Sequence, residues 1–88
     1  MPYIKQSERE NWAYPLQNIS TAMEYGVTPG DLNYIITQIV HSYVNRKGLN
    51  YTHLNDVVGV LESAKAEFQR RVVAPYEDDK IRTNGDVP

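Results

Sequence analysis

The sequence contains no cysteine. Disulfides, thiolate zinc sites and cysteine nucleophiles are therefore excluded. Histidine is also scarce, since only His41 and His53 are present, too few for a histidine-rich metal site. We predict that the protein uses neither a metal nor a cofactor.

Long apolar runs and a strong excess of basic charge are missing as well. The longest apolar stretches are a few residues long, whereas a membrane span needs about 20. The N-terminus lacks the apolar run of a secretory signal, so we predict a cytoplasmic protein with no membrane partner. The formal net charge is −2. Proteins that bind duplex nucleic acid are usually strongly basic, so nucleic acid is an unfavoured partner.

The chain has 88 residues, which predicts a single domain over residues 1–88. A chain this short buries only about 60–65% of the surface that it exposes when unfolded. Its core is therefore thin, and such a domain commonly depends on oligomerisation.

Glycine and proline divide the chain into four predicted helices. Ser7 and Glu10 have the spacing of a capping box and predict a short turn over residues 8–13. Because proline suits the first turn of a helix, we expect the first main helix to run from Pro15 to Tyr25 and to end at Gly26.

The second helix has the clearest start signal. Thr28-Pro29-Gly30-Asp31 offers a capping hydroxyl, a proline at the first helical position and an acid two residues later. Apolar residues then recur every three or four positions, which indicates a core-facing helix rather than a strand. Gly48 is expected to end it.

The third predicted helix runs from Tyr51 to Val73, with Asn50 as its cap. Pro75 is expected to end it at Ala74 or earlier, because proline pushes the preceding residue out of the helical region. A short fourth helix is then predicted over Pro75–Thr83.

The third helix also carries small residues on a face away from its apolar stripe, at Gly59, Ser63 and Ala66. Glycine inside a helix costs about 1 kcal/mol relative to alanine, which favours a close approach by another backbone. We therefore predict an all-α fold: a small bundle of three main helices plus a short C-terminal helix, completed by association with further copies of the chain.

Basic, aromatic and amide side chains gather around Pro75, and we take them as a candidate site for an anionic ligand. Arginine and lysine bind phosphates, and a tyrosine ring can stack on a base. The predicted ligand-binding residues are Tyr51, Arg70, Arg71, Tyr76, Lys80 and Asn84. The alternative is that Glu67 and Arg71 simply pair on the helix surface.

Two sequence patterns are typical of enzyme active sites. The acidic run Glu77-Asp78-Asp79 could be half of a Mg²⁺ site of the kind found in helical nucleotide pyrophosphohydrolases. The acids of the third helix have spacings that do not place them on one face. His53 and Asp56 have the spacing of a general-base dyad, but no nucleophile accompanies them. We predict no catalytic residue.

Several short motifs resemble a family of uncharacterised small proteins from bacteriophages and bacteria. They are Pro2-Tyr3-Ile4, Gly48-Leu49-Asn50-Tyr51, Gly59-Val60-Leu61-Glu62, Glu67-Phe68 with Arg70-Arg71, Pro75-Tyr76-Glu77-Asp78 with Lys80, and Asn84-Gly85-Asp86-Val87. The resemblance spans most of the chain. It implies a helical fold and a phage or prophage setting, but it brings no activity.

These observations favour a non-enzymatic, phage-type accessory protein with an anti-defence role. In this hypothesis a homo-oligomer binds and sequesters a small, anionic, nucleotide-like signal. Two alternatives stay open: a divergent Mg²⁺-dependent nucleotide pyrophosphohydrolase, and a module that binds another polypeptide.

Overall fold

The computed structural model describes residues 2–88, and all of the regular structure in that range is helical. The helices are α1 (Gln6–Ala22), α2 (Pro29–Lys47), α3 (Tyr51–Phe68) and α4 (Ala74–Asn84). A 3₁₀ turn, η1 (Met23–Tyr25), follows α1, and a π-helical turn, η2 (Gln69–Val73), joins α3 to α4. The predicted all-α class is confirmed.

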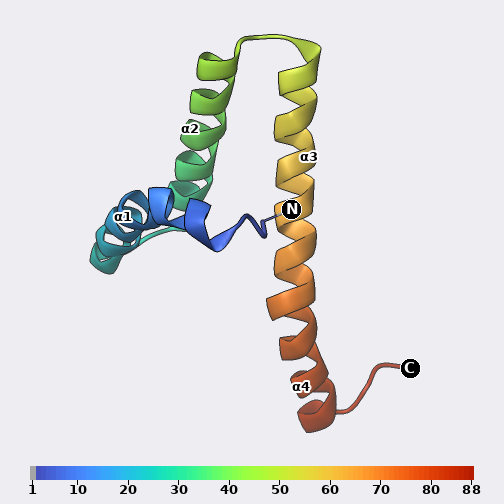
Figure 1. Cartoon of the computed structure of the whole chain (residues 1–88). Helices are drawn as coiled ribbons and strands as arrows, with labels where there is room; N and C mark the ends of the chain where they lie inside the picture. Colours follow the sequence, from blue (N-terminus) through green and yellow to red (C-terminus); the bar gives the residue numbers. More distant parts are fainter. Residues whose placement is uncertain (1) are drawn as a thin grey trace.

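Helices α2 and α3 form an antiparallel hairpin, and α1 projects sideways from the foot of α2 (Figure 1). Gly48 ends α2 with a φ of 107°, a left-handed conformation that favours glycine. The Asn50 side chain accepts a 2.9 Å hydrogen bond from the backbone N–H of His53. The Nδ1 atom of the His53 ring is hydrogen-bonded to the Gly48 carbonyl oxygen at a distance of 2.8 Å. The predicted end of α2 and the predicted cap of α3 are therefore confirmed.

The start of α2 has a complete capping box. The Asp31 backbone N–H donates to the Thr28 hydroxyl at 3.1 Å, and the Thr28 backbone N–H donates to the Asp31 carboxylate at 2.9 Å. Pro29 occupies the first turn, where its missing N–H costs nothing. The sequence signal at residues 28–31 is confirmed.

Replacing Thr28 with alanine is expected to lower the free energy of unfolding by about 1 kcal/mol, because one exposed donor of the first turn loses its acceptor. Chemical denaturation followed by circular dichroism measures the change. Ser7→Ala is the matched control and should have almost no effect, since α1 begins without a side-chain cap. Equal losses in both variants would contradict this account of the two helix starts.

The prediction for α1 was wrong at two points. The N-cap is Lys5, not Ser7, and no Ser7–Glu10 capping box forms. The helix also continues through Pro15, rather than starting there. Proline removes a single backbone hydrogen bond, to the carbonyl of Asn11. Because Asn11 and Pro15 are both exposed, water can reach that carbonyl and the helix tolerates the loss.

The prediction that Pro75 ends the third helix was also wrong. Helices α3 and α4 follow one another as one long rod (Figure 1). The π-helical turn η2 lies directly before Pro75 and contains one more residue per turn than an α-helix. This wider turn relieves the clash between the proline ring and the carbonyl of the preceding turn, so the chain passes Pro75 without a break.

No side chain among residues 2–88 is buried. The accessible surface is 7954 Å², whereas a compact chain of 10.1 kDa exposes about 5,300 Å². The radius of gyration is 16.7 Å, against about 12 Å for a compact domain of this length. The expected helices are present, but one chain by itself does not close them around a core.

Candidate functional site

The N-terminal segment of residues 2–5, here called the arm, reaches back to the middle of the rod (Figure 1). The Tyr3 hydroxyl donates to the Glu67 carboxylate. The Arg70 guanidinium donates to the same carboxylate at 2.8 Å and to the Tyr3 hydroxyl oxygen at 3.2 Å. At the other end of the arm, Arg9 donates to the Ile4 carbonyl at 2.9 Å. Tyr3, Glu67 and Arg70 thus tie the first residues of the chain to α3.

Glu67 is the most enclosed member of this group, with 23% of its side chain exposed. The hydrogen bond from Tyr3, and then that from Arg70, lowers the pKa of Glu67 below its ordinary value of 4.5. The Glu67 carboxylate in turn raises the pKa of Arg70. The ionised form of Glu67 is therefore the form that holds the arm.

Acidification is expected to release the arm. Because the pKa of Glu67 is lowered in the folded protein, its contribution to stability is present above the ordinary value of 4.5 and is lost as the pH falls below it. The fluorescence of Trp12, which lines a hollow with Tyr3, should change with a midpoint below that value. Tyr3→Phe should remove this transition, and a transition that is unchanged in Tyr3→Phe would contradict the assignment.

Towards the C-terminal end of the rod, some cationic side chains have an ion-pair partner in the described part of the chain and others do not. Arg82 pairs with Asp79, and Lys80 lies over the Tyr76 ring with its Nζ 5.3 Å from the ring centre. Within residues 2–88, neither Arg71 nor Lys80 has a carboxylate oxygen within 4.0 Å. These two cations are the ones that a bound anion or another chain could use.

The six predicted ligand-binding residues do not form one site in a single chain. Tyr51 opens α3, and at 1.5 Å per residue it lies about 28 Å along the rod from Arg70. Asn84 is the last residue of α4. Arg70 contacts the arm, and the Lys80 ammonium lies over the Tyr76 ring. Of the six residues, Tyr76 and Lys80 are the pair that these side-chain interactions join.

The residues of the two enzyme-like sequence patterns make structural contacts instead. The His53 ring is hydrogen-bonded to the Gly48 carbonyl and lies edge-on to Tyr43, with ring centres 6.3 Å apart. Tyr43 donates to Asp56 at 3.2 Å, and burial, followed by this bond, raises the pKa of Tyr43. Across residues 2–88 no group of three or more potential metal ligands comes together. His53 and Asp56 therefore stabilise the end of the α2–α3 hairpin and are not hydrogen-bonded to each other.

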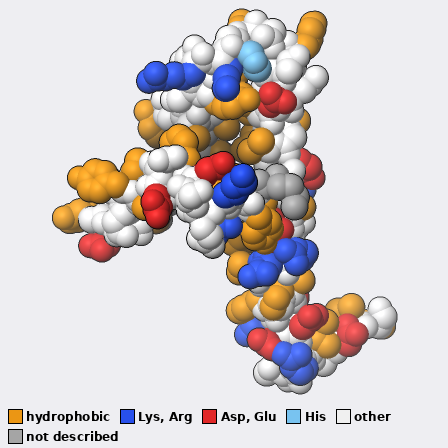
Figure 2. Space-filling view, in the orientation of Figure 1, with side chains coloured by type: hydrophobic (Ala, Val, Ile, Leu, Met, Phe, Trp, Pro, Cys, Tyr) orange, Lys and Arg blue, Asp and Glu red, His pale blue; other side chains and the backbone are white. Residues whose placement is uncertain are grey.

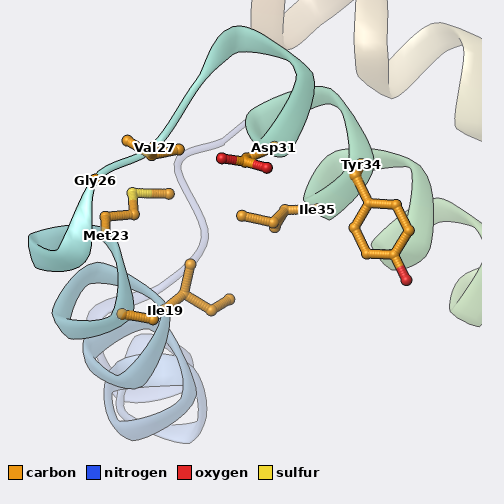
Figure 3. A pocket seen from close by; sticks show the side chains of 8 residues that line it. Ile19, Met23, Gly26, Val27, Asp31, Tyr34 and Ile35 are labelled. Atoms are coloured by element: carbon orange, nitrogen blue, oxygen red, sulfur yellow. The ribbon is translucent and has the colours of Figure 1, made fainter.

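An apolar groove of about 380 Å³ lies between α1 and α2 (Figure 3). Ile19 of α1 and Met23 of η1 face Ile35 of α2 across it, with Val27 above them. Asp31 lies at the rim, where its carboxylate already serves the α2 capping box. The groove offers apolar contact but no free charged group for an anionic ligand.

The contact of Tyr3 with Glu67 and Arg70 was missed in the sequence. The expected surface pair was Glu67 with Arg71, whereas Glu67 pairs with Arg70, three residues on. Helical spacing permits both pairs, so it could not choose between them. Tyr3 stood within the Pro2-Tyr3-Ile4 motif, but nothing in a single sequence links it to a residue 64 positions away.

None of the helices in residues 2–88 is long and apolar enough to cross a membrane. No curated protein and no solved structure matches the chain. The family model named Domain of unknown function (DUF6899) matches residues 1–87. The chain therefore belongs to the DUF6899 family.

Proposed function

We propose that this protein is a non-enzymatic binding protein that sequesters a small, anionic, nucleotide-like molecule at sites formed between copies of the chain. The observation that carries the proposal is the open structure of the chain: none of residues 2–88 is fully buried. A site that encloses a small molecule commonly buries most of the ligand surface. The exposed Tyr76 and Lys80 of one chain do not enclose a ligand, and a second copy of the chain would add the missing surface.

The chemistry of the site rests on Tyr76 and Lys80. The Lys80 ammonium and the Tyr76 ring form a preassembled pair of a cation and an aromatic surface. A phosphate on the cation and a base against the ring is a recognition mode that fits a nucleotide-like ligand. Sequestration needs no catalytic group.

The biological setting belongs to the same proposal. A small phage or prophage protein that binds a nucleotide signal would lower its free concentration and so protect the phage from a host defence that depends on it. Binding between subunits suits this role, because each oligomer then removes several ligand molecules. A cytoplasmic location follows from such a role.

The Mg²⁺-dependent pyrophosphohydrolase remains a weaker proposal. It needs carboxylates from two helices, and the acidic run Glu77-Asp78-Asp79 has Arg82 as its one described ion-pair partner, at Asp79. Release of pyrophosphate from a panel of nucleotides, only when Mg²⁺ is present, would favour the enzyme over the sequestering protein.

Native mass spectrometry tests the proposed function. Protein purified gently from cells with an active nucleotide-signalling defence should carry an added mass of a few hundred daltons per site, which is released on denaturation. Lys80→Ala should lose this mass while keeping the oligomer. Lys5→Ala is a control lysine outside the rod and should keep the ligand. An oligomer without added mass from such cells would overturn sequestration.

A further inference from the structure

The rod extends well beyond the helix that covers it. Helix α2 has 19 residues and is about 28 Å long, whereas the rod of α3, η2 and α4 is about 50 Å long. The turn η2 and helix α4 contact no helix except the rod itself within the described chain. We call residues 68–84 the overhang.

The overhang continues a line of apolar side chains that begins on α3, where α2 packs against it. In α3 this line passes through Val57, Leu61 and Ala64, and Val57 and Leu61 border the hollows between α2 and α3. It continues through Phe68, Val72 and Tyr76, whose exposed fractions are 59%, 52% and 60%.

The π-helical turn keeps this line straight. Phe68 and Tyr76 are eight residues apart, which in a regular α-helix exceeds two turns by almost one residue. The turn η2 contains one extra residue, so that the eight residues make two turns and both side chains face the same way. The same holds for Arg71 and Asp79, which lie together on one flank of the line.

Charge is ordered along the overhang. The basic pair Arg70-Arg71 precedes Pro75, and the acidic run Glu77–Asp79 follows it. Figure 2 shows basic side chains in the middle of the rod and a mixture of acidic and basic side chains nearer its lower end. When two copies pack antiparallel around a two-fold axis near Ala74, the basic pair of each overhang lies opposite the acidic run of the other, with Lys80 and Arg82 beyond that run.

The excess accessible surface of one chain is large enough to supply a subunit interface. The chain exposes about 2,700 Å² more than a compact chain of its mass. A stable interface buries about 800 Å² from each partner, and obligate dimers bury more. A second copy is therefore an occupant that fits in area, in apolar character and in charge.

We propose that two copies of this chain pair antiparallel through their overhangs, with Phe68 and Val72 in a shared seam, Tyr76 at the outer end of the seam, and Arg71 of each copy against Asp79 of the other. Asp79 already accepts from Arg82, and both side chains are largely exposed, so its carboxylate can accept a second donor. The pairing names the subunit contact on which the proposed function rests. It assigns Arg71 to the interface and leaves Lys80 and Tyr76 at its edge for a ligand.

Charge reversal tests the pairing by sedimentation velocity at low salt. Arg71→Glu alone and Asp79→Arg alone should each weaken the dimer at least tenfold, and the double variant Arg71→Glu/Asp79→Arg should restore it. Arg46→Glu, a reversal outside the overhang, should leave the dimer unchanged. Single variants that stay fully dimeric, or a double variant that does not recover, would overturn the pairing.

Crosslinking gives a second test that does not depend on these charges. Since the chain has no cysteine, Val72→Cys and Tyr76→Cys each introduce a unique thiol. A short bismaleimide should join the two variants efficiently when they are mixed after unfolding and refolding, because Val72 of one copy faces Tyr76 of the other. Equal, weak crosslinking in the mixture and in each variant alone would contradict the antiparallel arrangement. Added mass without this crosslink would leave sequestration intact and sink only the pairing.

Discussion

The variant Phe68→Asp is expected to be monomeric and largely unfolded at micromolar concentration. Phe68 is 59% exposed in one chain, and in the proposed pair its ring is covered by the second copy. Burying such a side chain contributes about 2 kcal/mol, and each pair contains two, so the dissociation constant should rise at least about a thousandfold. Sedimentation velocity and circular dichroism measure the two changes.

Tyr14→Asp is the matched control for Phe68→Asp. Tyr14 is 76% exposed and lies on α1, outside the overhang. Its replacement should leave both the association and the helix content almost unchanged. A folded, monomeric Phe68→Asp protein would show that the chain is stable alone and would contradict the need for a partner.

Deletion of Gln69 is expected to disrupt the rod and abolish association. Without the extra residue, η2 becomes an ordinary α-helical turn. Phe68 and Tyr76 are then seven residues apart, almost two α-helical turns, so the direction of Tyr76 changes by only about 20°. The ring of Pro75, however, meets the carbonyl of the preceding turn, which costs about 3 kcal/mol and breaks the rod at this point.

The substitution Gln69→Ala is the control for this deletion, because it keeps the number of residues and removes only an exposed side chain. We expect it to associate like the natural chain. Loss of far-ultraviolet helicity together with association in the deletion variant, but not in Gln69→Ala, would support the role of the π-helical turn. A deletion variant that still associates normally would show that the seam does not depend on η2.

The predictable part of the fold is the part that local chemistry decides. Thr28 and Asp31 satisfy each other within one turn, and Gly48 is free to take a positive φ, so the bounds of α2 can be found from neighbouring residues alone. The same reasoning failed at Pro15 and Pro75. In both cases the helix continues because its surroundings tolerate the proline, through exposure of the freed carbonyl at Pro15 and through a wider turn before Pro75.

The site could be predicted only in part, for a related reason. The residue types around Pro75 indicated anion recognition, but their positions along a continuous rod depend on the turn η2, which no spacing rule anticipates. Tyr51 was grouped with Arg70 although one helix separates them by about 28 Å. The role of Arg70 as a partner of the arm required a contact between the two ends of the sequence.

The arm adds a link between the N-terminus and the rod. Tyr3 contacts Glu67, the residue before the overhang begins at Phe68. It also contacts Arg70, which lies within the overhang. A neighbouring copy that packs on the overhang would therefore lie beside the arm. The ionised state of Glu67 stabilises this region above its lowered pKa, so association should also weaken under acidic conditions.

We expect the chain to reach its stable fold only as a pair or a larger assembly of pairs. Sedimentation equilibrium over a range of concentrations, with helicity measured on the same samples, measures this dependence. The expected result is a dimer, or an even multiple of chains, that loses helicity as it dissociates on dilution. A single species with the mass of one chain, 10.1 kDa, and full helicity at every concentration would contradict it.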